Sequence, residues 1–80
     1  MLAEQFQKDA NDKYELKKKK YGESYKTMPL HKLRIRLMAE YQEWQEIVFK
    51  ESRIYKPDLE YQELIDIRNL CSMLAERIKG

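Results

Sequence analysis

Residues that interrupt helices are rare in this chain of 80 residues, which contains only two glycines and two prolines. Because glycine and proline are the main helix breakers, the chain has few points at which a helix must end. β-branched residues, which favour strands, are also scarce, and this argues against a sheet. We therefore predict an all-α fold and a single small domain over residues 1–80.

Long apolar runs and cysteine pairs are missing as well. No apolar run approaches the roughly 18 residues of a transmembrane helix, and the N-terminus shows no hydrophobic region of a signal peptide. Cys71 is the only cysteine, so an internal disulfide is excluded, and burial statistics favour a place in the core for its thiol. We expect a reducing, cytoplasmic setting and no membrane partner.

Charge of one sign is not in large excess either. The chain has 16 lysines and arginines against 14 acidic residues, which gives a net charge of +2. A nucleic-acid-binding domain usually has a larger basic excess, so nucleic acid ranks last among the partners that we consider. The hydrophobic fraction of 42% and the charged fraction of 38% are instead typical of amphipathic helices.

Apolar periodicity and the few breaker residues divide the chain into three predicted helices. We expect helices over residues 2–20, 29–52 and 58–79, with residues 53–57 forming a loop. Gly22 provides a stop after the first helix, and Asp58 can cap the third.

The predicted second helix is apolar on two sides. One stripe has spacings of three and four residues and consists of Leu30, Leu33, Leu37, Tyr41, Trp44 and Val48. A separate set, formed by Ile35, Met38 and Phe49, lies on a different side. Because a helix that is apolar on two sides usually packs on two sides, we predict a helical bundle that is completed by homo-oligomerisation.

Four carboxylates lie on or beside the apolar stripes of the second and third helices. Glu40 and Glu43 are three residues apart near the second-helix stripe, and Glu63 and Asp66 repeat this spacing within the third-helix stripe. The latter stripe consists of Leu59, Ile67, Leu70, Leu74 and Ile78, flanked by Leu64 and Cys71. An unpaired carboxylate in an apolar interface costs several kcal/mol, so it needs a cation, a proton or a partner base.

The two acidic pairs can meet across the interface if the two helices pack antiparallel. Four converging carboxylates would repel each other, and Mg²⁺ or Mn²⁺ would relieve the repulsion because these cations prefer oxygen ligands. We therefore predict a metal site formed by Glu40, Glu43, Glu63 and Asp66. The alternative is that these acids lie on solvated helix faces or pair with bases such as Arg36, because acidic pairs at this spacing are common on helices.

The acidic pairs resemble a family signature. Residues 40–43 (EYQE), nineteen intervening residues and residues 63–66 (ELID) resemble the ExxE…ExxD motif of MazG-like all-α nucleoside triphosphate pyrophosphohydrolases. The family's first motif often has an additional Glu where this chain has Ala39. Residues 20–25 (KYGESY) resemble an upstream segment of some members, and Asn69 resembles the polar residue that follows ExxD.

The resemblance spans about residues 20–78, and it implies an oligomeric helical enzyme. Family members have sites formed by packed helices of a dimer or tetramer, and they hydrolyse nucleoside triphosphates, deoxynucleotides among them, to a monophosphate and pyrophosphate. The resemblance implies that the four acids hold Mg²⁺ and act in catalysis. Four further candidates for substrate binding are Lys20, Tyr21, Arg36 and Asn69.

Two other classes of function stay open on the sequence alone. A non-catalytic helical interaction module would use the same acids to pair with bases of a partner protein. A compact nucleic-acid binder would use the lysine run of residues 17–20, although such a run is more often a solvated helix end. A screen of nucleoside triphosphates for hydrolysis separates the enzyme from both.

Overall fold

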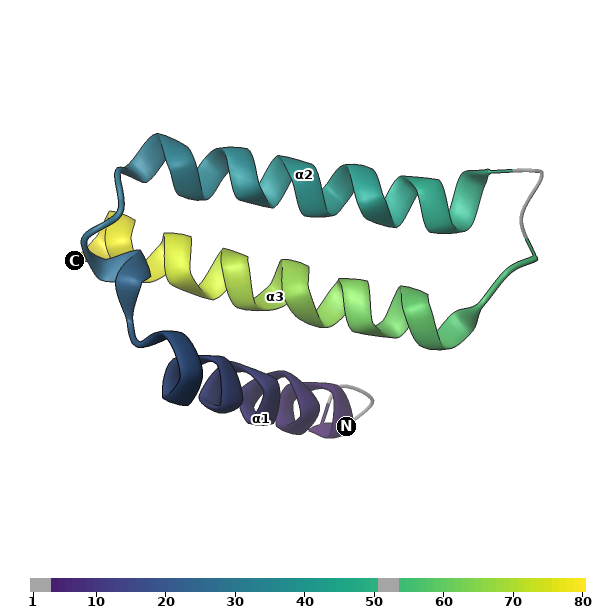
Figure 1. Ribbon diagram of the computed structural model, residues 1–80, viewed down its shortest axis with the longest axis horizontal. Coiled ribbons are helices and arrows are strands. Elements are labelled where there is room, and N and C mark those ends of the chain that lie inside the picture. The colour runs from purple at the N-terminus through teal and green to yellow at the C-terminus, as the bar shows by residue number, and fades with distance from the viewer. Residues whose placement is uncertain (1–3, 51–53) are drawn as a thin grey trace.

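The computed structural model describes residues 4–50 and 54–80, which form three α-helices and one short 3-10 helix (Figure 1). They are α1 (Glu4–Tyr21), η1 (Ser24–Lys26), α2 (Leu30–Phe49) and α3 (Pro57–Lys79). No strand occurs in these two ranges, so the predicted all-α class is confirmed. Within the same ranges, no helix combines the length and the apolar character that a membrane span requires.

The three α-helices lie side by side, with α3 between α1 and α2 (Figure 1). α2 and α3 run antiparallel to each other (Figure 1). α1 contacts the other side of α3. The antiparallel pair is the arrangement that brings the two acidic segments of the sequence to opposite sides of one interface.

The helix ends follow local signals, with two differences from the predicted boundaries. Gly22 has a left-handed φ of 73°, and its N–H donates to the carbonyl oxygen of Lys18 over 2.8 Å, which ends α1. α2 ends at Phe49 rather than near residue 52, and residues 51–53 lie outside the described part of the chain. Asp58 lies within the first turn of α3 rather than at its cap, where its charge favours the helix dipole.

The hydrophobic core lies between α2, α3 and the connection that contains η1. Its buried members are Tyr25, Leu33, Leu70 and Leu74, with Tyr14, Met28, Leu30, Leu37 and Met73 packed around them. Leu33 is completely buried, as its place in the predicted stripe requires. Ile65 is also completely buried, although it lies on another side of α3 from the predicted stripe. α3 therefore buries side chains toward both of its neighbours.

Four residues of the apolar pattern predicted for α3 are exposed, and Leu64, at 38% exposure, is one of them. Leu59 and Ile78 are exposed, because they lie in the first and last turns of the longest helix, at the margins of the core. Cys71 is exposed rather than buried. Helical periodicity predicts an apolar stripe along the whole of α3. The part of this stripe that is buried depends on how far α1 and α2 extend along α3.

Hydrogen bonds fasten the connection between α1 and α2 onto the end of α3. The Tyr25 hydroxyl donates to Glu76 Oε2 over 2.7 Å, and the Tyr14 hydroxyl donates to the Tyr25 oxygen over 3.1 Å. Arg77 Nη1 donates to the carbonyl oxygens of Tyr25 and Met28. These bonds hold the segment that precedes α2 in the sequence against α3. They therefore help to position the start of α2 against α3.

Candidate metal-binding carboxylate cluster

Three of the four predicted carboxylates converge between α2 and α3. Glu40 and Glu43 of α2 and Glu63 of α3 each offer one carboxylate oxygen, and these three oxygens lie within 4.8 Å of one another. The spacing of three residues places Glu40 and Glu43 one turn apart on one side of α2, and antiparallel packing places Glu63 opposite them. We call these three residues the carboxylate cluster.

Glu63 is the buried member of the cluster, with 9% of its surface exposed. Its Oε2 atom is buried and has no hydrogen-bond partner within residues 4–50 and 54–80. Burial, and then the neighbouring carboxylates of Glu40 and Glu43, raise the pKa of Glu63 to about 9. At neutral pH this group therefore holds a proton or requires a cation beside it.

Exposure increases across the cluster. Glu40 is partly buried and Glu43 is exposed, whereas Glu63 is buried. A cation at this position would be reached from the side of Glu43 and could keep water molecules there. This arrangement suits Mg²⁺, which gives up its water ligands reluctantly.

Asp66, the fourth predicted ligand, is held by α1 instead. Its Oδ1 atom lies 2.7 Å from Lys13 Nζ and 3.6 Å from Lys17 Nζ. A spacing of three residues rotates Asp66 by about 60° around the axis of α3 relative to Glu63. Glu63 therefore faces α2, while Asp66 faces the lysines of α1.

Asn69, a predicted substrate-binding residue, is buried in the contact between α1 and α3. Its Nδ2 atom donates to the carbonyl oxygen of Ala10 over 3.1 Å, and its Oδ1 atom accepts from Arg68 Nη1 over 3.0 Å. Both ends of the amide are thus engaged within the protein. In this structure Asn69 fastens the two helices together, and it lies at the edge of a hollow of about 320 Å³ that Tyr14 and Met73 also line.

Two more predicted substrate-binding residues, Arg36 and Lys20, lie outside the cluster. Arg36 is exposed on α2, one turn before Glu40, and forms no ion pair with Glu40 in the described part of the chain. It lines a hollow of about 460 Å³ together with Lys17 and Lys18 of α1. Lys20 is exposed near the end of α1. Tyr21 is the last residue of α1, and its side chain lies outside the described part.

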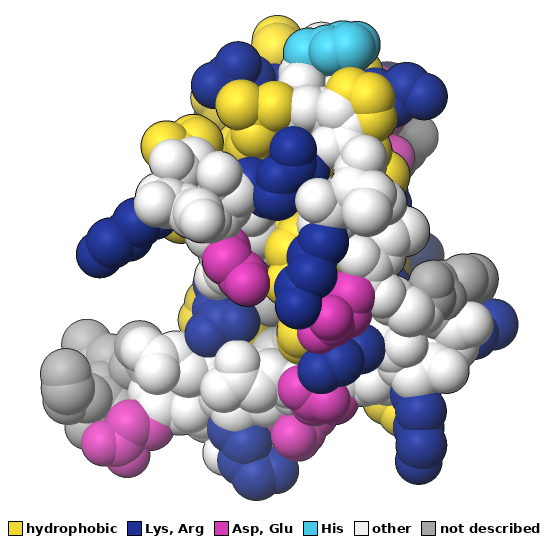
Figure 2. All heavy atoms as spheres, turned by 90° about the vertical axis from the view of Figure 1, so that its left-hand side faces the viewer, with side chains coloured by type: hydrophobic (Ala, Val, Ile, Leu, Met, Phe, Trp, Pro, Cys, Tyr) yellow, Lys and Arg dark blue, Asp and Glu magenta, His cyan; other side chains and the backbone are white. Residues whose placement is uncertain are grey.

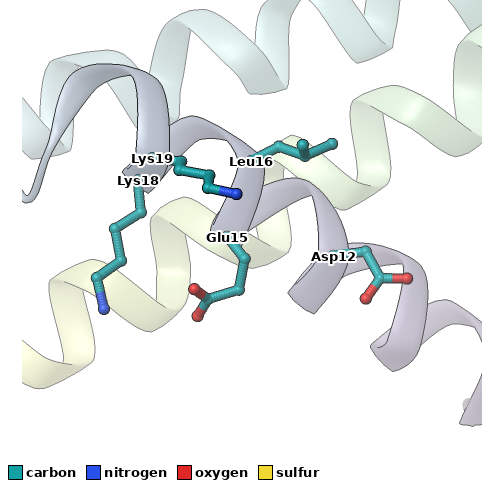
Figure 3. Close-up of a pocket in the computed structure, with 5 residues that line it drawn as sticks. All are labelled: Asp12, Glu15, Leu16, Lys18 and Lys19. Atoms are coloured by element: carbon teal, nitrogen blue, oxygen red, sulfur yellow. The ribbon is translucent and has the colours of Figure 1, made fainter.

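A second hollow, of about 600 Å³, lies on α1 and is separate from the cluster. It is lined by Asp12, Glu15, Leu16, Lys18 and Lys19 (Figure 3). All five side chains come from one helix (Figure 3), and no residue of α2 or α3 lines the hollow. It is a surface depression along α1, and we assign no site to it.

The end of the molecule that carries η1 has mixed charge. Figure 2 shows lysine and arginine side chains distributed among acidic and apolar ones on this face. Glu23 contacts Lys26 and Lys18, with Nζ–Oε distances of 2.7 and 3.0 Å, and these lysines lower the pKa of Glu23. This face offers no continuous basic surface to a polyanion.

Comparisons of this chain with protein-family models, curated proteins and solved structures find no match. The fold and the cluster define a small three-helix protein with an acidic site between antiparallel helices.

Mg²⁺ or Mn²⁺ is expected to raise the melting temperature of the apo protein. A cation that binds only the folded state stabilises it by mass action, by about 2.7 kcal/mol at a concentration 100 times the dissociation constant. Thermal unfolding followed by circular dichroism measures the effect, with NaCl at equal ionic strength as the control for screening. The shift should disappear in Glu63→Gln and persist in Glu46→Gln, an exposed acid three residues after Glu43. Equal melting temperatures with and without the divalent cations would count against a preformed site.

Proposed function

We propose that this chain is a Mg²⁺-dependent nucleoside triphosphate pyrophosphohydrolase, which cleaves NTP or dNTP to a monophosphate and pyrophosphate. The observation that carries the proposal is the convergence of three carboxylate oxygens within 4.8 Å around the buried Glu63. The resemblance of residues 40–43 and 63–66 to the MazG-like signature supports the reaction type.

The donor set of the cluster fits Mg²⁺ or Mn²⁺. Glu40, Glu43 and Glu63 offer only carboxylate oxygens, which hard divalent cations prefer. The Glu63 Oε2 atom, buried without a hydrogen-bond partner in the described residues, is the kind of atom that a cation would satisfy. A bound Mg²⁺ would supply neutralisation of the triphosphate charge and activation of a water molecule for attack on phosphorus.

The solvent exposure of each residue indicates which of the remaining roles it can have: proton transfer, phosphate binding or exclusion of water. Glu43 is the solvent-exposed acid of the cluster, so it is the group best placed to accept a proton from an attacking water. Arg36, exposed one turn before Glu40, can contact a phosphate group with its planar guanidinium. Burial of Glu63 excludes water from one side of the cluster, which strengthens electrostatic interactions there.

Product analysis tests the proposal directly. Purified protein is incubated with a panel of NTPs and dNTPs and Mg²⁺, and anion-exchange chromatography resolves the products. Monophosphate with pyrophosphate is the expected pair, whereas diphosphate with phosphate would indicate cleavage at the other anhydride and contradict the proposal. Activity must disappear in Glu63→Gln and remain in Glu46→Gln, because a contaminating hydrolase would survive both substitutions. Absence of hydrolysis across the panel with either cation would also reject the enzyme.

The outer face of α2 supports a second proposal, a homo-oligomer. Ile35, Met38 and Phe49 are 61, 63 and 69% exposed, and helical periodicity places them on one side of α2. Exposed apolar side chains that gather on one face mark interaction surfaces. We propose that a second copy of the chain covers this face in a homodimer or homotetramer. The same face is also what favours the alternative function, a non-catalytic interaction module.

Sedimentation velocity is expected to give a multiple of the 9.8 kDa chain mass at micromolar concentration. Met38→Lys should shift the distribution toward the monomer, because a charge would be buried in the apolar contact. Leu16→Lys is the matched control, since Leu16 is an exposed apolar residue on α1. A single 9.8 kDa species for the unmodified chain would contradict the oligomer.

We also propose a cytoplasmic location. Cys71 is an exposed free thiol, and a reducing compartment keeps such a group from forming intermolecular disulfides. Non-reducing electrophoresis of protein from its native source, alkylated at lysis, should show a single chain. A disulfide-linked dimer through Cys71 in that sample would contradict this location.

A further inference from the structure

Asp66 lies at the boundary between the two interfaces of α3. Its carboxylate contacts Lys13 and Lys17 of α1, but it follows Glu63 of the cluster by only one helical turn. Lys13 and Asp66 are both partly buried, with 28 and 22% of their side chains exposed. A rotation of about 60° around the helix separates the directions of Asp66 and Glu63. Asp66 is therefore the acid of α3 that lies one turn from the cluster while pairing with the lysines of α1.

Contacts other than the lysine ion pairs also join α1 to α3. The Tyr61 hydroxyl donates to Asp9, and the edge of one ring of Phe6 and Tyr61 meets the face of the other at a centroid distance of 5.8 Å. The buried Asn69 amide binds the carbonyl oxygen of Ala10. α1 can therefore remain docked when the ion pair between Lys13 and Asp66 breaks.

We propose that Lys13, with a smaller contribution from Lys17, competes with a divalent cation for Asp66. In this view Lys13 is a positioning residue: it holds the fourth carboxylate away from the cluster and so sets the cation affinity of the site. The inference rests on the proposed metal site formed by Glu40, Glu43 and Glu63. Its physical basis is that one carboxylate cannot satisfy an ammonium group on α1 and a cation on the α2 side at full strength.

Competition between α1 and the cation must act in both directions. If Lys13 lowers the affinity of the cation, the bound cation must weaken the contact of Lys13 by the same factor. Amide hydrogens in the middle of α1 are therefore expected to exchange faster with Mn²⁺ present than without it. A purely structural ion pair predicts slower or unchanged exchange in α1, since the cation would only stabilise the fold.

Titration of Mn²⁺ followed by electron paramagnetic resonance tests the competition without relying on activity. Lys13→Met should lower the dissociation constant by about tenfold, the low end of the changes seen when partners of metal ligands are altered. Lys17→Met should have a smaller effect, because its Nζ lies 3.6 Å from Asp66 and its side chain is mostly exposed. Lys8→Met is the matched control, since Lys8 pairs with Asp12 on the solvent side of α1.

A second substitution separates ligand exchange from a general effect of charge. In Lys13→Met,Asp66→Asn the gain in Mn²⁺ affinity should disappear, because no carboxylate is released. If the double variant keeps the gain, Lys13 acts only through its electric field and the exchange of Asp66 is wrong. Circular dichroism on each variant confirms that the affinities refer to folded protein.

The outcomes also distinguish this inference from the proposed function. Equal Mn²⁺ affinity in the unmodified chain and in Lys13→Met overturns the competition but leaves the three-carboxylate site intact. Absence of Mn²⁺ binding in both overturns the metal site and the competition together. Tighter binding in Lys13→Met alone, lost with Asp66→Asn and accompanied by faster exchange in α1, supports both.

Discussion

Replacing Glu63 by glutamine is expected to reduce nucleotide hydrolysis at least about 100-fold while stabilising the apo protein. The substitution keeps the shape of the side chain but removes the negative charge that would hold the cation. In the apo state a negative charge on Glu63 destabilises the folded protein, because Glu63 is buried and faces Glu40 and Glu43. A neutral amide removes it, and each kcal/mol gained raises the melting temperature by about 4–8 °C in a domain of this size.

The stabilisation should depend on pH in a direction that the pKa of Glu63 dictates. The pKa is raised from 4.5 to about 9 in the folded chain, so the folded state retains a proton that the unfolded state releases. The contribution of Glu63 to stability is complete below pH 4.5 and is lost as the pH rises through 9. Urea unfolding at about pH 5, 7 and 9 should show the advantage of Glu63→Gln increasing with pH.

The other acid variants should change turnover and apo stability in a different combination. The set of variants therefore separates a metal-binding role from a structural role. Glu40→Gln and Glu43→Gln are each expected to remove most turnover, and Asp66→Asn should do so as well if Asp66 moves from Lys13 to the cation during catalysis. Asp66→Asn should also destabilise the fold, by about 1 kcal/mol, because it breaks the partly buried pair with Lys13. If Glu63→Gln melts much earlier than the unmodified chain and keeps normal turnover per folded molecule, the metal site is wrong and Glu63 has a structural role.

Leu33→Ala is expected to cost about 2–5 kcal/mol of unfolding free energy, the largest stability loss that we predict. Leu33 is completely buried in the core with Tyr25, Leu70 and Leu74, so truncation removes apolar contacts and leaves a cavity. Small domains have little stability to spare, and a loss of this size unfolds a substantial fraction of the molecules.

Leu16→Ala is the matched control for this experiment, since Leu16 is exposed on α1. The same change there should alter the free energy by no more than about 0.5 kcal/mol. Urea unfolding of both variants at one fixed protein concentration gives the comparison, because an oligomer makes apparent stability depend on concentration. Equal losses in the two variants would contradict the position of the core between α2, α3 and η1.

The sequence by itself determined the elements that depend on local periodicity. Few breaker residues and apolar spacings of three and four predict three helices, and the structure confirms them to within a few residues. The spacing of Glu40 and Glu43, and the place of Glu63 in an apolar stripe, anticipated the convergence of three acids. The spacing of acids on each helix follows from the helical repeat, which is a property of neighbouring residues, whereas their convergence also requires the antiparallel packing of α2 and α3.

Only the tertiary structure decided which neighbour each side of α3 meets. The same stripe that contains Glu63 was expected to contain Asp66, but Asp66 lies toward α1 and pairs with Lys13. Leu59 and Cys71 match the apolar pattern and are nevertheless exposed. Helical periodicity shows which residues share a side of a helix, whereas burial and charge pairing depend on where distant segments pack against that side.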